Sequence, residues 1–211
     1  MYKAPTEVPY ADNFTFVVID DCNLRCSYCY EEGKTKHYME KATADKAVAF
    51  LLQQYTHMSS ILQVDFIGVE PLMNIEIVKY AIAKCEEHLK GKWEVINFSA
   101  STNGTLIKEP VIKERLSKLH CKLILGLSLD GCKQAHDMAS GRSFDNVMSV
   151  FCFWKKQSPC GMTKTTLSRD GLPFCLREPN FFYHYHCHTL WLTLFLRTCG
   201  RMETMCFITN K

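Results

Sequence analysis

The chain has 211 residues, of which 47% are hydrophobic and 22% charged, so its composition is that of a globular protein and not of a disordered one. A formal net charge of +3 is too small to indicate a nucleic-acid or membrane surface, and no apolar stretch approaches the roughly 20 residues of a membrane span. The opening MYKAPTEVPY lacks the pattern of a signal peptide, so we expect a cytoplasmic protein that binds neither nucleic acid nor membrane. Its twelve cysteines are then reduced thiols, and we expect Cys85, Cys121 and Cys152 to act as small core hydrophobes.

Strand-like and helix-like patterns alternate along most of the chain. The patterns predict strands at 14–20, 62–68, 93–102, 121–129 and 162–168. Helical spacing of apolar residues predicts helices at 42–57, 75–90, 109–119 and 144–157. This alternation predicts an α/β fold in which right-handed crossovers build a parallel sheet. Five such strands are consistent with an open or partial (β/α) barrel, whose functional loops lie at the carboxyl ends of the strands.

Three cysteines follow the first predicted strand in the string CNLRCSYCY. Cys22, Cys26 and Cys29 have C-x3-C-x2-C spacing and present three thiols from one short loop. An iron–sulfur cubane has four irons and usually takes four cysteine ligands. Three ligands leave one iron without a protein ligand, as in catalytic metal sites that keep an open position.

This loop resembles the cluster-binding motif of radical S-adenosylmethionine (radical SAM) enzymes, including an aromatic residue, Tyr28, before the last cysteine. The resemblance implies a 4Fe–4S cluster whose open iron is chelated by S-adenosylmethionine (AdoMet), reductive cleavage of the sulfonium, and hydrogen abstraction by a 5′-deoxyadenosyl radical. The alternative from the spacing alone is a zinc-binding interaction module that uses the same thiols with His37 as a fourth ligand.

Further motifs of the same family follow the next three predicted strands. GVEPLMN at 68–74 resembles a Gly-Gly-Glu-Pro motif that holds the AdoMet ammonium group, with Val69 in place of the second glycine. STNGT at 101–105 and SLDG at 128–131 resemble the third and fourth strand-end motifs. Asp130 is expected to shape the last turn. The resemblance therefore implies AdoMet contacts from these residues: Tyr28, Gly68, Glu70, Thr102, Asn103 and Ser128.

HDMASGRSFDNVM at 136–148 resembles the SPASM-type branch, which modifies peptides or proteins. This implies a peptide or protein substrate and an electron donor such as a flavodoxin or ferredoxin. The branch places an arginine near Ser140 for the AdoMet carboxylate, and the nearby Arg142 is displaced by two residues, so we leave it out of the site. For His136 and Asp137 we expect local capping or solvation rather than proton transfer.

The end of the chain differs from the rest. We interpret 1–174 as a radical SAM core and 175–211 as an atypical tail in which strand and helix periodicity largely vanish. A frameshift in the encoding DNA would explain the tail, and the core would then be C-terminally truncated, with an exposed sheet edge in place of a sixth strand. A truncated, inactive cluster-binding fragment is one alternative. A metal site at His184, His186 and His188 is another.

Overall fold

A single sheet forms the centre of the molecule. The computed structural model describes residues 11–31, 35–54, 59–177, 189–198 and 201–210. Strands lie side by side in chain order: β1 (Ala11–Ile19), β2 (Ile61–Gly68), β3 (Val95–Thr102), β4 (Leu123–Ser128), β5 (Thr163–Leu167), β6 (Thr189–Thr198) and β7 (Arg201–Asn210). β1 to β6 are parallel and β7 is antiparallel to β6. The two outer strands, β1 and β7, do not pair with each other, so the predicted α/β fold with an open, partial barrel is confirmed.

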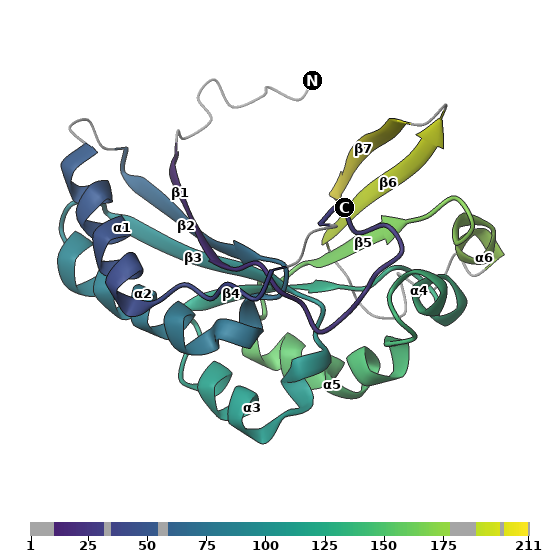
Figure 1. Cartoon of the computed structure of the whole chain (residues 1–211), viewed down its shortest axis with the longest axis horizontal. Coiled ribbons are helices and arrows are strands. Elements are labelled where there is room, and N and C mark those ends of the chain that lie inside the picture. The colour runs from purple at the N-terminus through teal and green to yellow at the C-terminus, as the bar shows by residue number, and fades with distance from the viewer. Residues whose placement is uncertain (1–10, 32–34, 55–58, 178–188, 199–200, 211) are drawn as a thin grey trace.

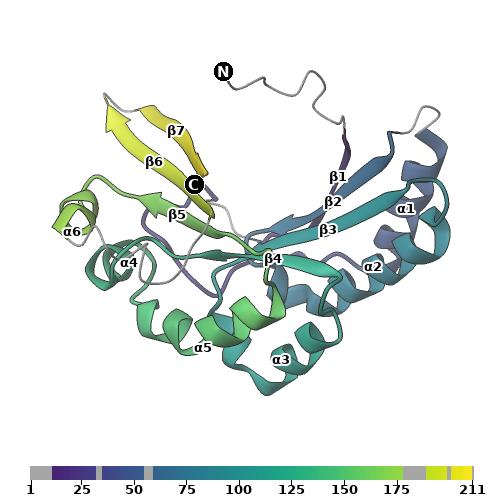
Figure 2. The ribbon, with the colours of Figure 1, turned by 180° about the vertical axis from the view of Figure 1, so that it is seen from behind.

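The helices connect successive parallel strands. They are α1 (Lys41–Gln54), α2 (Ile75–Leu89), α3 (Pro110–Ser117), α4 (Lys133–Ala139), α5 (Phe144–Gln157) and α6 (Leu172–Arg177), with 3-10 turns η1 (Pro71–Asn74) and η2 (Thr105–Lys108). Figures 1 and 2 show α1, α2, α3 and α5 on one side of the curved sheet, while none of the described helices covers its other side. None of the helices in the described ranges has the length and apolar character to cross a bilayer.

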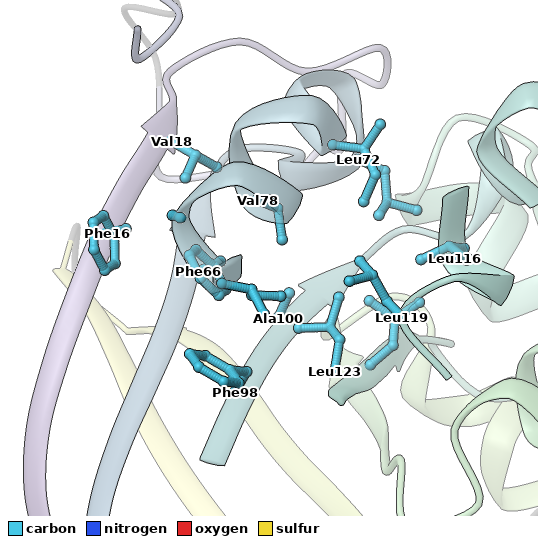
Figure 3. Close-up of a cluster of buried hydrophobic side chains, with 14 of the residues drawn as sticks. Phe16, Val18, Phe66, Leu72, Val78, Phe98, Ala100, Leu116, Leu119 and Leu123 are labelled. Carbon is cyan, nitrogen blue, oxygen red and sulfur yellow. The ribbon is translucent and has the colours of Figure 1, made fainter. Parts of the chain in front are cut away.

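The hydrophobic core fills the space between the sheet and these helices (Figure 3). The ring of Phe66 stacks between Phe16 and Phe98, with centroid distances of 5.4 and 6.2 Å. Alternation along β2 buries Leu62 and Phe66 against the helices and leaves Asp65 on the open side. Because side chains alternate along each strand, one face of the sheet packs in the hydrophobic core and the other face remains available for binding.

Two expectations about the chain were wrong. Residues 189–198 form β6, which pairs with β5, so β5 is not the exposed edge that the loss of periodicity suggested. Cys85 is buried, as expected, but Cys121 and Cys152 are exposed. Cys121 has a φ of 63° in the turn before β4, a conformation set by the turn and not by packing. The predicted histidine site at 184–188 lies outside the described residues.

Candidate active site

A cavity of about 560 Å³ opens at the carboxyl ends of the parallel strands. Parallel strands bring their carboxyl ends to one edge of the sheet, which is why motifs far apart in the sequence meet here. Eight of the nine predicted site residues line this cavity: Cys22, Cys26, Tyr28, Cys29, Gly68, Thr102, Asn103 and Ser128. The ninth, Glu70, is buried behind the lining.

None of the three cysteines of the loop forms a disulfide, and their side chains lie near one another. Cys22 is buried, with 7% of its surface exposed, while Cys26 and Cys29 are half-buried. Burial raises the pKa of the Cys26 thiol, a hydrogen bond from Ser140 opposes this, and nearby Asp130 and the other two thiols raise it further. Because thiolates that repel one another are stabilised by a shared cation, this donor set fits a metal group held by sulfur.

The number and kind of the ligands available here can be compared with what a zinc ion and a cluster require. Within the described ranges, no group of three or more histidine, cysteine or acidic side chains converges tightly enough to hold one metal ion. A single zinc ion requires four ligands around one centre, whereas a cubane takes each thiolate at a separate iron. His37, the predicted fourth zinc ligand, instead lies beside Asp20, with 3.2 Å between Nδ1 and Oδ2. The three thiols at one cavity therefore fit a cubane with one open iron, and the fourth ligand of the zinc alternative is engaged with Asp20.

Gly68 allows β1 and β2 to approach closely just before the cysteine loop. It has a φ of +145°, and a Cβ atom at this position would lie 2.2 Å from the carbonyl oxygen of Ile19. The backbone N–H groups of Val69 and Glu70 donate to the carbonyls of Ile19 and Asp21, at 3.2 and 3.1 Å. The glycine is thus required by the neighbouring strand, and its segment is tied to the residue that precedes Cys22.

Glu70 braces the site from behind the cavity lining. Its carboxylate accepts hydrogen bonds from the Leu72 N–H at 3.1 Å, the Thr102 hydroxyl at 2.8 Å and the Asn103 N–H at 2.8 Å. Burial raises the pKa of Glu70 to about 7, and these three hydrogen bonds oppose the rise. The side chain therefore joins the ends of β2 and β3, and its contact with AdoMet stays a prediction.

The Asn103 side chain connects the end of β3 to the cysteine loop. Its Oδ1 accepts hydrogen bonds from the N–H and the hydroxyl of Thr105, at 3.0 and 2.7 Å. Its Nδ2 donates to Asn23 Oδ1 at 2.9 Å and to Cys22 Sγ at 3.6 Å. The amide is therefore engaged at both ends by the protein.

Asp130 is the centre of a second brace, on the other side of the loop. Its Oδ2 accepts hydrogen bonds from the Tyr28 hydroxyl at 2.7 Å and from Ser140 Oγ at 2.5 Å, and its Oδ1 accepts one from the Thr166 N–H at 2.9 Å. Asp130 thus does more than shape a turn, which the sequence did not indicate. Ser140, where the resemblance implies an arginine, is buried in this network, and Arg142 does not line the cavity.

His136 is buried in the wall of the cavity. The solvation that was expected as one possibility for this residue is therefore not found. Its Nδ1 accepts a hydrogen bond from the Asp130 N–H at 3.1 Å, and its Nε2 lies 2.9 Å from the Ser143 hydroxyl. Since Nδ1 must accept, the neutral ring carries its proton on Nε2, and burial lowers the pKa of His136. For Asp137 the expectation of local capping is confirmed, because its Oδ1 accepts from the Phe144 N–H at 3.0 Å.

Comparison with known proteins decides the family. The model of the radical SAM superfamily matches residues 16–160, which include the cysteine loop and the carboxyl ends of β1 to β4. The chain belongs to the radical SAM superfamily. It is 27% identical over 162 residues to the uncharacterized protein MJ0907 of Methanocaldococcus jannaschii, covering 74% of this chain and 53% of that protein. It is 23% identical over 176 residues to the GTP 3′,8-cyclase of Rhodococcus opacus, covering 76% and 47%.

The solved structures that are similar to this radical SAM chain share its fold. One is anSMEcpe with bound AdoMet and the Cp18Cys peptide, with a TM-score of 0.70 and 21% identity, covering 88% of this chain and 50% of that one. The chain thus spans about half the length of the relatives that it matches.

Some polar groups in the cavity of this radical SAM core are free to meet a ligand. Ser101, Ser128 and Lys164 line it and make no side-chain hydrogen bond or ion pair with any other residue that the structure describes. Burial lowers the pKa of Lys164, and the charge of Asp65 on the open side of the sheet opposes this. Of the three, Ser128 was predicted from its strand-end motif. The inward-facing strand positions of Ser101 and Lys164 were the signal that could have found the others.

Proposed function

We propose that this chain is a radical SAM enzyme core that binds a 4Fe–4S cluster through Cys22, Cys26 and Cys29, with AdoMet in the adjoining cavity. The observation that supports this most is the position of the three cysteines, which are not in disulfides and line one cavity together with four successive strand ends. When bound, the cluster and AdoMet supply an electron and a 5′-deoxyadenosyl radical for hydrogen abstraction.

The residues of the chain divide into two roles in this proposal. Tyr28, Gly68, Thr102, Asn103 and Ser128 contact AdoMet from the cavity wall, where Ser128 offers a free hydroxyl for a ribose or carboxylate oxygen. The buried Glu70 acts on AdoMet indirectly, through the Thr102 hydroxyl and the Asn103 backbone that it holds. The hydrogen-bond networks around Glu70 and Asp130 hold the cysteine loop against the strand ends. Little reorganisation is therefore needed when a cluster binds.

For the substrate we propose a peptide or protein, with reduction by a flavodoxin or ferredoxin. A nucleoside triphosphate, the substrate class suggested by the GTP cyclase relative, carries several negative charges that are usually matched by arginine and lysine. Among the described residues that line the cavity there is one lysine, Lys164, and no arginine. On β1 to β5, the strands whose side chains are described, the open side of the sheet instead offers mainly neutral polar groups, with Asp65 and Lys164 as opposite charges, which suits a peptide backbone better than a triphosphate.

Anaerobic reconstitution with iron and sulfide tests this proposal. We expect a brown protein with about four irons per chain that forms 5′-deoxyadenosine from AdoMet after reduction with dithionite. The matched variant Cys26→Ser should stay colourless or lose most of its iron, while Cys152→Ser, at an exposed cysteine outside the cavity, should behave like the wild type.

Each alternative gives a different result in the same preparation. A colourless protein that retains zinc would contradict the cluster assignment. A brown protein that forms no 5′-deoxyadenosine would identify an inactive cluster-binding fragment. Stimulation of 5′-deoxyadenosine formation by GTP, and not by a mixture of cysteine- and serine-containing peptides, would contradict the peptide substrate.

A further inference from the structure

The sulfur of Cys22 differs from the other two cluster sulfurs in its surroundings. It is the most buried of the three, and two N–H groups point at it. The Leu24 N–H donates at 3.3 Å and Asn103 Nδ2 donates at 3.6 Å. Hydrogen bonds to cluster sulfurs are one of the means by which a protein sets the reduction potential of a cluster. The two N–H groups at Cys22 are therefore placed to influence the potential of a cluster bound here.

The orientation of the Asn103 amide is fixed by its partners. The Thr105 N–H can only donate, so the atom that it meets at 3.0 Å must be Oδ1 of Asn103. The amide nitrogen is therefore the atom that faces Cys22 and Asn23. The Asn103 backbone N–H is held in turn by the buried Glu70 carboxylate, so the side chain has little freedom to turn its donor away from the sulfur.

We propose that Asn103 is a positioning residue that raises the reduction potential of the cluster through its N–H···S hydrogen bond to Cys22. This rests on the proposed function, because it requires a cluster at the three cysteines. Reduction adds negative charge to the cluster and its thiolates, and an N–H dipole directed at the Cys22 sulfur stabilises that charge. Asn103, which the resemblance assigns to AdoMet binding, thus also affects the reduction potential of the cluster.

The test is a redox titration of the reconstituted cluster, followed by the electron paramagnetic resonance signal of its reduced state. Asn103→Leu removes the donor, and we expect a three- to tenfold shift of the reduction equilibrium toward the oxidised cluster. This corresponds to a fall of about 30 to 59 mV, since a tenfold change is 59 mV for a one-electron couple. Asn103→Asp keeps an oxygen for Thr105 but places a negative charge beside the sulfur, so its potential should fall further.

Thr105→Val is the matched control, because it removes a hydroxyl from the same hydrogen-bond network without removing the N–H that faces Cys22. We expect this variant to keep the wild-type potential. As a second readout, protein labelled with ¹⁵N-asparagine should show a nitrogen coupling to the reduced cluster that is present in wild type and Thr105→Val and absent in Asn103→Leu.

The outcomes separate the two proposals. If the wild type forms a cluster and both Asn103 variants keep its potential, or if Thr105→Val shifts the potential as much as they do, the role of Asn103 is overturned and the proposed function stands. If the wild type forms no cluster, both are overturned.

Discussion

Replacing Gly68 by alanine should destabilise the protein strongly, because this residue combines an unusual backbone conformation with a close interstrand contact. Its φ of +145° is one that L residues rarely adopt, which costs about 1–3 kcal/mol. A Cβ atom would meet the Ile19 carbonyl oxygen at 2.2 Å and Ile19 Cγ2 at 2.9 Å. The oxygen belongs to the backbone of a buried strand end, so relief requires β1 and β2 to separate, at a further cost of about 1–3 kcal/mol.

We therefore expect Gly68→Ala to lower the free energy of unfolding by about 2–6 kcal/mol, a large part of the roughly 5–15 kcal/mol typical of a domain. Urea denaturation followed by far-ultraviolet circular dichroism measures this change. Gly91→Ala is the control, since Gly91 also has a positive φ, +80°, but nothing lies within 4 Å of its added Cβ. The control should lose about 1 kcal/mol. The reasoning would be refuted if Gly68→Ala cost no more than Gly91→Ala.

Two further substitutions test the braces around the cysteine loop. The pKa of Glu70 is about 7 in the folded protein and lies above its ordinary value of 4.5, so the folded state binds this proton more tightly than the unfolded state. Proton binding therefore stabilises the fold fully below pH 4.5. This stabilisation is lost as the pH rises through 7. Between pH 5 and 8 the wild type should thus lose about 2.5 kcal/mol of stability relative to Glu70→Gln, which cannot titrate. An equal change in the free energy of unfolding of the two proteins over this pH range would contradict this. Tyr28→Phe removes the hydroxyl that donates to Asp130 and should cost about 1–2 kcal/mol in urea denaturation, whereas Tyr30→Phe, at an exposed tyrosine, should cost nothing measurable.

The parts of the fold that the sequence predicted are those encoded by local patterns. Short strand-like patterns, including the continuous apolar run at 121–129, identified β1 to β5, and the order of the strand-end motifs placed Cys22, Gly68 and Ser128 around one cavity. The apolar string LWLTLFL at 190–196 has no period-2 alternation, and β6 was therefore missed, although the sheet extends through it.

The roles of individual polar residues were harder to predict, because they depend on contacts between distant segments. Asp130 was predicted to shape a turn. No local feature of the sequence indicates that Tyr28, Ser140 and Thr166 all donate hydrogen bonds to it. Glu70 was predicted as an AdoMet contact, which stays a prediction, and nothing in its local sequence indicated that it also caps η1 and joins β2 to β3. Such side chains are assigned by tertiary geometry and not by spacing.

The hydrogen bond between Tyr28 and Asp130 spans 102 residues, and the one between Asn103 and Cys22 spans 81. Long-range contacts of this kind form late, after the intervening chain has been ordered. During synthesis, the cysteine segment leaves the ribosome well before the residues that hold it in shape. The cysteine loop consequently reaches its final shape only after β4 and α4 are complete, and its thiols remain open to oxidation until then.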